Sequence, residues 1–487
     1  MTDAQADTAN SLPQKPGASQ PLTCDVAVIG AGTAGLAAER AARANGASTL
    51  LIDPEFIGTL CANYGCMPSK LLIAAARARH QVDQAGLFGI DVGSVAVDDA
   101  ALLNRVRSER DRFAALTRDS IETLPDGICI KSHARFTGPD TLVLDDGRTV
   151  KAGAIVIATG SGAALPAPFD MLGDRALTNR SVFEIETLPD SLGVVGSGSI
   201  GLELAQAFAR LGVKVTLLDK AERMGNVRCA RVHGALRKIM ERDMAVHLGV
   251  DVDAECAQSG VRLTWSGKET GEALVDRVLV AVGRPPTLEG LWLEKAGIAC
   301  DDSGVPCHDR ATMRCGDSAI FLAGDVAADF PLLHEASHDG AIAGRNAAAL
   351  PAEIRTERYV SFAITFTDPP LVSIGKSEEH GAVTGTTSFD DQGRARVEGR
   401  DEGALTLYAA APHGTLIGAD LIAPAGEHLG HILAWAIQHK MTATQLLQMP
   451  FYHPTIEEGL KKALRTICGA TPIALPTDQD SGTPSGG

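Results

Sequence analysis

Two cysteines, Cys61 and Cys66, stand five positions apart and form the most closely spaced pair among the ten cysteines of the 487-residue chain. Thiols at this spacing can form a disulfide across roughly one helical turn. Near a helix N-terminus their thiolates would be stabilised, and Lys70 supplies a cation nearby. The residues alone fit a redox-active dithiol, part of a zinc site or a structural disulfide. We favour the dithiol, because zinc needs about four ligands and no second Cys or His pair with suitable spacing appears nearby.

Two glycine-rich units flank this pair in the sequence and must position it. The first runs over residues 24–53 and carries Gly30-x-Gly32-x-x-Gly35; the second runs over residues 191–219 and carries Gly196-x-Gly198-x-x-Gly201. Each motif follows an apolar run, precedes a helical stretch and is followed by a second apolar run that ends in an acid, Asp53 or Asp219. The first glycine permits a tight turn, the second admits a pyrophosphate and the third allows close helix–strand packing. The helix N-terminus favours the phosphates.

The spacing strengthens the dinucleotide interpretation. Both copies place the acid 23 residues after the first glycine, where it can accept hydrogen bonds from ribose hydroxyls. Two dinucleotides in one enzyme suggest a relay between a tightly held flavin and an exchanging nicotinamide. Asp219 favours NAD over NADP, because a carboxylate repels a 2′-phosphate. Lys220 and Arg223 lie close enough in sequence to reach a phosphate, so NADP stays open.

Length and composition set the wider limits. The chain is long enough for two or three domains. Its net charge of -16 argues against a nucleic-acid partner. No apolar run is long enough to cross a bilayer, and the polar N-terminus is unlike a signal peptide, so we expect a cytoplasmic protein. A reducing cytoplasm disfavours a structural disulfide.

With these motifs, the chain resembles the flavoprotein disulfide reductases, which include dihydrolipoamide dehydrogenase, glutathione reductase and mercuric reductase. The similarity covers residues 25–468. Besides the cysteine pair, it rests on five further motifs: Ala158-Thr159-Gly160, Val282-Gly283-Arg284, Ala323-Gly324-Asp325, Phe366-Thr-Asp-Pro369, and His453-Pro-Thr455 with Glu458.

The resemblance implies an α/β fold with two Rossmann-like domains and a C-terminal α+β dimerisation domain. The expected order is a disordered segment at residues 1–21, the FAD domain at 22–160, the NAD(P) domain at 161–285, the second FAD segment at 286–357, the dimerisation domain at 358–470 and a flexible tail at 471–487. The residues expected to bind FAD are Gly30, Gly32, Gly35, Asp53, Lys70, Thr159, Gly160, Gly324 and Asp325. Those expected to bind NAD are Gly196, Gly198, Gly201, Asp219 and Gly283. No metal site is expected.

By the same resemblance, Cys66 lies against the flavin and Cys61 is the outer thiol that attacks substrate. Lys70 sits near the flavin and pairs with Glu203, and Asp325 holds the ribityl chain. An unpaired buried lysine would lose its charge, so a partner is also chemically expected.

His453 is the candidate acid–base, because histidine titrates in the range in which thiols exchange protons. Glu458, on a helix begun by Pro454, would fix the imidazole tautomer. In this family the base comes from the partner subunit, so the resemblance implies a homodimer with shared active sites.

The leading hypothesis is therefore a dihydrolipoamide-dehydrogenase-like enzyme that acts on a small dithiol or a lipoyl-bearing protein. A reductase of another acceptor, such as a different disulfide, a mercuric ion or a quinone, is the alternative. A non-enzymatic flavoprotein module would leave Cys61, Cys66 and His453 unexplained.

Three departures from the family pattern bear on this choice. Gly58-Thr59-Leu60 replaces a usual Gly-Gly-Thr, Cys468 stands alone where mercuric reductases carry a cysteine pair, and Phe451 and Tyr452 precede the catalytic histidine. We expect the two aromatics to narrow the approach to His453.

Overall fold

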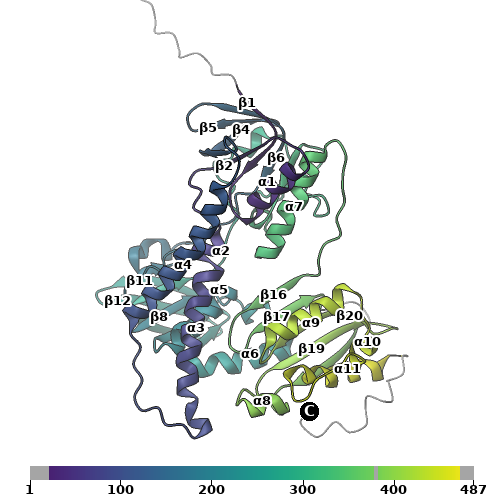
Figure 1. Ribbon diagram of the computed structural model, residues 1–487. Coiled ribbons are helices and arrows are strands. Elements are labelled where there is room, and N and C mark those ends of the chain that lie inside the picture. Colours follow the sequence, from purple (N-terminus) through teal and green to yellow (C-terminus); the bar gives the residue numbers. More distant parts are fainter. Residues whose placement is uncertain (1–20, 378–381, 472–487) are drawn as a thin grey trace, which may run out of the picture.

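The computed structural model describes residues 21–377 and 382–471 (Figure 1). The expected disordered segment at residues 1–21 and the expected tail at 471–487 therefore lie outside the described residues, apart from Pro21 and Thr471. The described chain forms three units, each built on one or two of the β-sheets described below. No helix within the described ranges is both long and apolar enough to span a bilayer.

The first unit is built on a sheet with the strand order β3-β2-β1-β6-β5-β4, and β15 also pairs with β6. Strands β1, β2, β3, β6 and β15 pair in parallel, whereas β4 and β5 form an antiparallel ribbon. The strands are β1 (Leu22–Ile29), β2 (Thr49–Asp53), β3 (Cys129–Lys131), β4 (Ala134–Gly138), β5 (Thr141–Leu144), β6 (Thr149–Ile157) and β15 (Ile320–Leu322). Because β15 comes from far along the chain, the second unit is an insertion in the first.

Helices α1 (Thr33–Ala44) and α7 (Leu333–Ala349) pack closely beside this sheet (Figure 1). The approach depends on two glycines of α7, since a Cβ on Gly340 would lie 2.1 Å from the Ala34 carbonyl oxygen and one on Gly344 would lie 2.0 Å from that of Ala38. Three further helices lie between β2 and β3 in the chain: α2 (Leu60–Tyr64), α3 (Cys66–Asp83) and α4 (Asp99–Glu122). Helix α3 runs down to the second unit and packs against α5 (Ser199–Arg210).

The second unit repeats the parallel arrangement, with the strand order β10-β9-β8-β14-β7. Its strands are β7 (Ala176–Leu177), β8 (Ser191–Val195), β9 (Lys214–Asp219), β10 (Ala245–Leu248) and β14 (Arg277–Val280), and a separate antiparallel sheet holds β11 (Val250–Ala257), β12 (Gly260–Gly267) and β13 (Gly271–Val275). Helix α6 (Ala230–Asp243) extends from this unit to β19 of the third.

The third unit is an antiparallel sheet with the strand order β16-β17-β20-β19-β18. Its elements are β16 (Phe362–Thr365), β17 (Leu371–Gly375), β18 (Val383–Ser388), α8 (Gly393–Val397), β19 (Ala404–Ala410), β20 (Thr415–Ile422), α9 (Gly426–Gln438), α10 (Ala443–Leu447) and α11 (Gly459–Ala470). Helices α9 and α11 pack on the sheet and enclose an apolar core with it. Two parallel α/β units followed by an α+β unit confirm the predicted fold class.

Candidate active site

The two cysteines lie on separate helices that meet at a glycine. Helix α2 starts after Thr59, whose hydroxyl accepts a hydrogen bond from the Ala62 backbone N–H at 3.2 Å. Gly65 ends α2, and Cys66 is the first residue of α3. A Cβ on Gly65 would come within 3.1 Å of the Cys61 Cα. Glycine at this position therefore lets the two helices meet with their cysteines side by side.

Both cysteines are free thiols, and their electrostatic settings differ. The pKa of Cys66 is lowered to about 6, chiefly by a hydrogen bond from the Cys61 thiol, and the Lys70 ammonium adds to this effect against the opposing effect of burial. The same hydrogen bond, together with burial, raises the pKa of Cys61. The position of Cys66 at a helix N-terminus also favours its thiolate. At neutral pH the pair therefore holds one thiolate, on Cys66, and one thiol, on Cys61.

Lys70 lies one turn after Cys66 on α3 and forms an ion pair with Glu203 of α5. The Lys70 Nζ lies 2.8 Å from Glu203 Oε2, and the ammonium sits 4.4 Å from the centre of the Phe366 ring. Glu203 is nearly buried, and its second oxygen accepts the Phe366 backbone N–H at 2.8 Å. The contact expected between Lys70 and Glu203 is thus present, and Phe366, whose motif was noted but given no role, completes it.

His453 and Glu458 form a second cluster at the start of α11. The His453 Nδ1 lies 2.9 Å from Glu458 Oε2. Although burial opposes it, hydrogen bonds from the Lys461 ammonium, the Thr455 backbone and His453 hold the pKa of the Glu458 carboxyl below its usual range. The buried Glu458 is therefore ionised at neutral pH, while the His453 side chain remains 59% exposed. An ionised carboxylate at Nδ1 leaves the other imidazole nitrogen free to exchange protons.

Two details near His453 differ from expectation. The helical segment begins at Ile456, with Thr455 as its cap, and not at Pro454; the hydroxyl of Thr455 and the carboxylate of Glu458 cap each other's backbone in a capping box. Phe451 packs on the core of the third unit, with the Lys461 ammonium 5.2 Å from its ring centre. Tyr452 is 84% exposed in the single chain, so it is the more accessible of the two aromatics.

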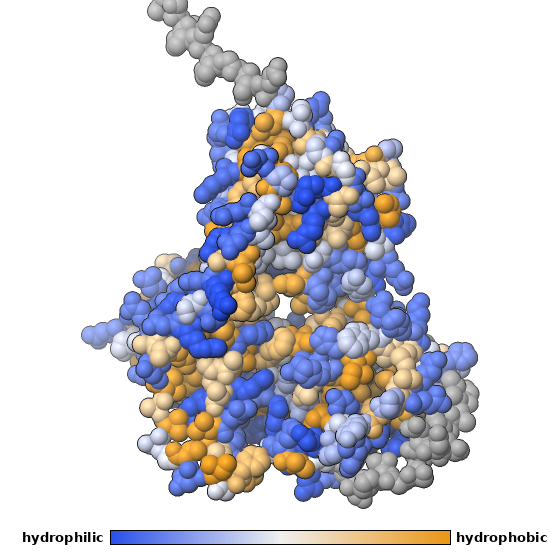
Figure 2. All heavy atoms as spheres, viewed as in Figure 1, coloured by the Kyte–Doolittle hydropathy of each residue, from blue (hydrophilic) through white to orange (hydrophobic). Residues whose placement is uncertain are grey.

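Within one chain the His453 cluster does not reach the thiols. Helix α11, which directly follows the cluster, lies on the far side of the third unit from α2, which carries Cys61 (Figure 1). The space-filling view shows the third unit as a separate lobe below the first. Figure 2 also shows apolar side chains on the surface of the second and third units, in the lower half of the view. A second chain is thus required if the histidine is to act on the thiols.

The first glycine motif forms a turn that suits a dinucleotide. Gly30 has φ +104°, and a Cβ on Gly35 would lie 1.8 Å from the Gly30 carbonyl oxygen. Gly32 is the N-cap residue of α1, and a Cβ at this position would meet no atom within 4 Å. The N-terminus of α1 is therefore open to an anion. Asp53 supports the turn by accepting the Ala31 backbone N–H at 2.9 Å.

The second motif repeats this geometry with different residues. A Cβ on Gly201 would lie 1.9 Å from the Gly196 carbonyl oxygen, and one on Gly198 would meet nothing within 4 Å. Asp219 Oδ2 accepts both the backbone N–H and the hydroxyl of Ser197, each at 2.5 Å. The residues present therefore fit a dinucleotide at each motif.

Residues of the three other predicted binding motifs lie where the chain passes between the two nucleotide units. The Thr159 hydroxyl donates to the Thr287 carbonyl oxygen at 2.6 Å, and Asp325 accepts the Ser161 hydroxyl at 3.0 Å and pairs with Arg284 at 3.1 Å. Sequence reasoning gave Ser161 and Arg284 no role. Arg284 belongs to the Val-Gly-Arg motif and could have been found there, whereas Ser161 carried no signal. The remaining residues of these motifs that were predicted to bind are Gly160, Gly283 and Gly324, all with positive φ.

No group of three or more His, Cys, Asp or Glu side chains in the described part of the chain is placed to hold a metal ion. The charged groups that act on Cys66 are the Lys70 ammonium and the Glu203 carboxylate, and the Phe366 ring contacts that ammonium. This set suits proton and electron transfer at sulfur.

Comparison with known proteins gives consistent results across the chain. Residues 24–340 match the pyridine nucleotide-disulphide oxidoreductase family, and residues 361–464 match its dimerisation domain. Dihydrolipoyl dehydrogenase from Bacillus subtilis is 30% identical over 463 residues, which covers 91% of this chain and 98% of the relative. The enzyme of that name from Chlamydia muridarum is 31% identical over 470 residues, covering 93% and 98%.

Solved structures show the same architecture. LpdA from Mycobacterium tuberculosis has a TM-score of 0.76 and 25% identity, and the match covers 91% of this chain and 99% of that one. The HOCl-induced flavoprotein disulfide reductase RclA from Escherichia coli has a TM-score of 0.77 at 22% identity with the same coverage. The second likeness concerns the fold alone.

Proposed function

The chain belongs to the pyridine nucleotide-disulphide oxidoreductase family, and from this premise we propose that it transfers electrons between a dithiol and NAD(H) through Cys61 and Cys66. Enzymes of this family use FAD and NAD(H). FAD, when bound, accepts two electrons from the reduced thiol pair and passes them to the nicotinamide. The observation that carries the proposal is the pair of adjoining thiols where α2 meets the N-terminus of α3, with the Lys70 ammonium one turn along α3 and held by Glu203 at 2.8 Å.

The unequal pKa values of the two thiols assign a role to each sulfur. A substrate thiolate attacks Cys61 of the Cys61–Cys66 disulfide, and Cys66 leaves as the thiolate, because the thiol with the lower pKa is the better leaving group. The second substrate thiol then attacks the mixed disulfide and releases Cys61. The substrate leaves as a disulfide, and its two electrons remain on the pair.

Two protons must be placed during this exchange. The released Cys61 takes one, in keeping with its raised pKa. The other is accepted by His453 of the second chain, whose orientation is fixed by Glu458. We propose that the dimerisation domain delivers this histidine across the interface of a homodimer, so each active site combines residues of both subunits.

Within this class we propose dihydrolipoamide, free or on a lipoyl-bearing protein, as the substrate. The relatives at 30% and 31% identity that carry the name dihydrolipoyl dehydrogenase support this choice. Tyr452, which precedes His453 in sequence and is exposed in the single chain, is the feature of this site that departs from the family pattern, whereas Phe451 is partly buried against the core of the third unit.

The test is a turnover assay with dihydrolipoamide and NAD⁺, alongside a panel of other disulfides, mercuric ion and quinones with NADH. We expect measurable dihydrolipoamide oxidation, and we expect Tyr452→Ala to raise kcat/KM if the ring hinders the approach to His453. A holoenzyme whose FAD is reduced by NADH but which never oxidises dihydrolipoamide, with or without Tyr452, would exclude lipoyl groups. The panel would then identify the alternative acceptor.

The coenzyme preference is expected to favour NADH. The two cations that the sequence suggested for a 2′-phosphate make other contacts in this structure: Lys220 pairs with Asp251 at 3.1 Å, and Arg223 donates to the Arg228 carbonyl oxygen. We expect Asp219→Ser to lower the ratio of kcat/KM for NADH to kcat/KM for NADPH by roughly tenfold. The substitution removes the carboxylate that repels the 2′-phosphate of NADPH. Asp253→Ser, at an exposed carboxylate of β11, is the matched control. A wild-type preference for NADPH would refute this assignment.

The pH dependence of the Cys66 thiolate gives a further prediction. Because Cys61 is the chief cause of the low pKa of Cys66, Cys61→Ala should raise that pKa above about 6. A raised pKa means that the thiolate is lost at a higher pH as the solution is acidified. The long-wavelength absorbance that a thiolate gives beside bound FAD measures the midpoint, and an unchanged midpoint in the variant would contradict the hydrogen-bonded pair.

A further inference from the structure

One face of helix α5 is bonded along its length to the segment 365–369, which joins β16 to β17 in the third unit. The residues Ser199, Glu203, Gln206 and Arg210 are spaced by four, three and four positions and therefore share a face. Their partners follow the segment in order. Ser199 bonds the Thr365 hydroxyl at 2.8 Å, and Glu203 accepts a hydrogen bond from the Phe366 N–H at 2.8 Å. Gln206 accepts from the Asp368 N–H at 2.8 Å, and Arg210 donates to Asp368 Oδ2 at 2.6 Å.

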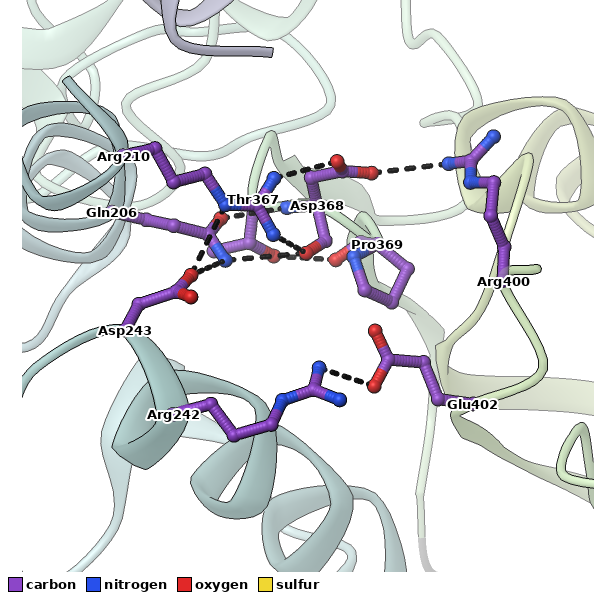
Figure 3. A network of polar contacts seen from close by, with 9 residues as sticks. All are labelled: Gln206, Arg210, Arg242, Asp243, Thr367, Asp368, Pro369, Arg400 and Glu402. Carbon is purple, nitrogen blue, oxygen red and sulfur yellow. Dashed lines mark hydrogen bonds and ion pairs between the residues drawn. The ribbon is translucent and has the colours of Figure 1, made fainter. Parts of the chain in front are cut away.

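We call this row of bonds between α5 and the segment 365–369 the seam. Asp368 makes the largest number of its bonds (Figure 3). Its carboxylate pairs with Arg210 and, at 3.0 Å, with Arg400 of the third unit. Its backbone carbonyl oxygen accepts from Arg210 at 3.0 Å and from the Gln206 amide at 3.2 Å. Arg210 is 6% exposed and is also held by Asp243 at 3.1 Å. Five of the bonds that fix Asp368 therefore come from three side chains on two domains.

Glu203 links the seam to the thiol site, because it bonds both Phe366 and Lys70. That carboxylate has two hydrogen-bonding partners in the described part of the chain, Lys70 on one oxygen and the Phe366 N–H on the other. A glutamate side chain has three rotatable bonds, so one contact cannot fix its orientation. The Phe366 N–H supplies the second contact. Its position depends on a segment that is held on one side by Thr365, the last residue of β16, and on the other side by Asp368, two residues away.

We propose that Asp368, held by Gln206 and Arg210, is a positioning residue that fixes Glu203 through Phe366 and so keeps Lys70 beside the Cys66 thiol. Asp368 acts at a distance and touches neither substrate nor sulfur. Burial of Asp368 opposes its ionisation, but Arg210 and then Arg400 keep the pKa of the carboxyl below its usual value, so the anchor stays charged at neutral pH. The inference deepens the proposed dithiol chemistry and rests on it for the role of Cys66.

The test is the pH midpoint of the long-wavelength absorbance of the NADH-reduced holoenzyme, which reports the Cys66 thiolate. Asp368→Asn keeps the shape of the anchor but removes its charge. Lys70 attracts the thiolate, so loosening Lys70 should raise the midpoint, by roughly half a pH unit. In a Glu203→Gln background the same substitution should cause no shift, because the route from Asp368 to Lys70 is already broken.

A matched control comes from the same interface. Arg242 and Glu402 form another ion pair between the same two units, and neither is hydrogen-bonded or ion-paired to the described segment 365–369 (Figure 3). Glu402→Gln should leave the midpoint unchanged. If Asp368→Asn does not fold, Arg400→Gln removes a more exposed partner of Asp368 and should give a smaller shift in the same direction.

The proposal is overturned if folded Asp368→Asn, or Arg400→Gln in its place, has the wild-type midpoint or a lower one. It is equally overturned if the shift persists without Glu203 or if Glu402→Gln produces it too. The absorbance is measured after reduction by NADH and needs no dithiol substrate. The midpoint therefore tests the role of Asp368 even if dihydrolipoamide is not the substrate.

Discussion

Replacing Cys66 by serine is expected to lower dithiol-dependent turnover by about 1,000-fold or more and to remove the long-wavelength absorbance of the reduced enzyme. The first effect follows because serine cannot form the disulfide that accepts the substrate's electrons. The second follows because the low-pKa thiolate of the pair is on Cys66. Steady-state assays and absorbance spectra of the purified holoenzyme measure both.

Cys61→Ser should lose turnover to the same extent but keep the absorbance, since Cys66 remains. Both variants should still pass electrons from NADH to an artificial acceptor, because that route bypasses the thiols. Cys256→Ser, at an exposed cysteine of β11, is the control and should behave as wild type. A reversed pattern, with the absorbance lost only in Cys61→Ser, would exchange the roles of the two sulfurs.

A heterodimer of a Cys61→Ser chain and a His453→Gln chain is expected to recover about half of the wild-type activity per dimer. One of its two sites combines the mutant cysteine with the mutant histidine and is dead. The other combines the intact cysteine of one chain with the intact histidine of the other. The Cys61→Ser homodimer should be inactive, and the His453→Gln homodimer should retain roughly 1% or less, as expected for the loss of a general base.

The experiment requires co-expression with two affinity tags and purification through both. If His453 instead served the cysteines of its own chain, the heterodimer would hold no intact site and would show no gain over its parents. Glu458→Gln in place of His453→Gln should give the same pattern with a smaller loss in the parent, because it disturbs the orientation of the imidazole and leaves the ring in place.

Much of the fold and of the candidate site was predictable from sequence because the relevant signals are local. The glycine motifs, their following acids and the Cys61–Cys66 pair each lie within a few dozen residues, where spacing reflects turn and helix geometry directly. These patterns predicted two dinucleotide-binding units and a redox-active thiol pair, and the fold class was confirmed. The expected pairing of Lys70 with Glu203, 133 residues apart, came from the family resemblance and not from any local pattern.

Only the tertiary structure decided how these groups affect one another. The unequal pKa values of the two thiols depend on the meeting of α2 and α3 at Gly65 and on the Lys70 ammonium, which Glu203 of another unit holds. Packing placed Phe451 against the core and left Tyr452 exposed, although the two are neighbours in sequence. The Asp368 anchor joins side chains up to 162 residues away, and no spacing rule predicts such a contact, because it depends on how two separately folded domains pack. Sequence thus determined which chemical groups this protein has, and domain packing determined their charge state and position.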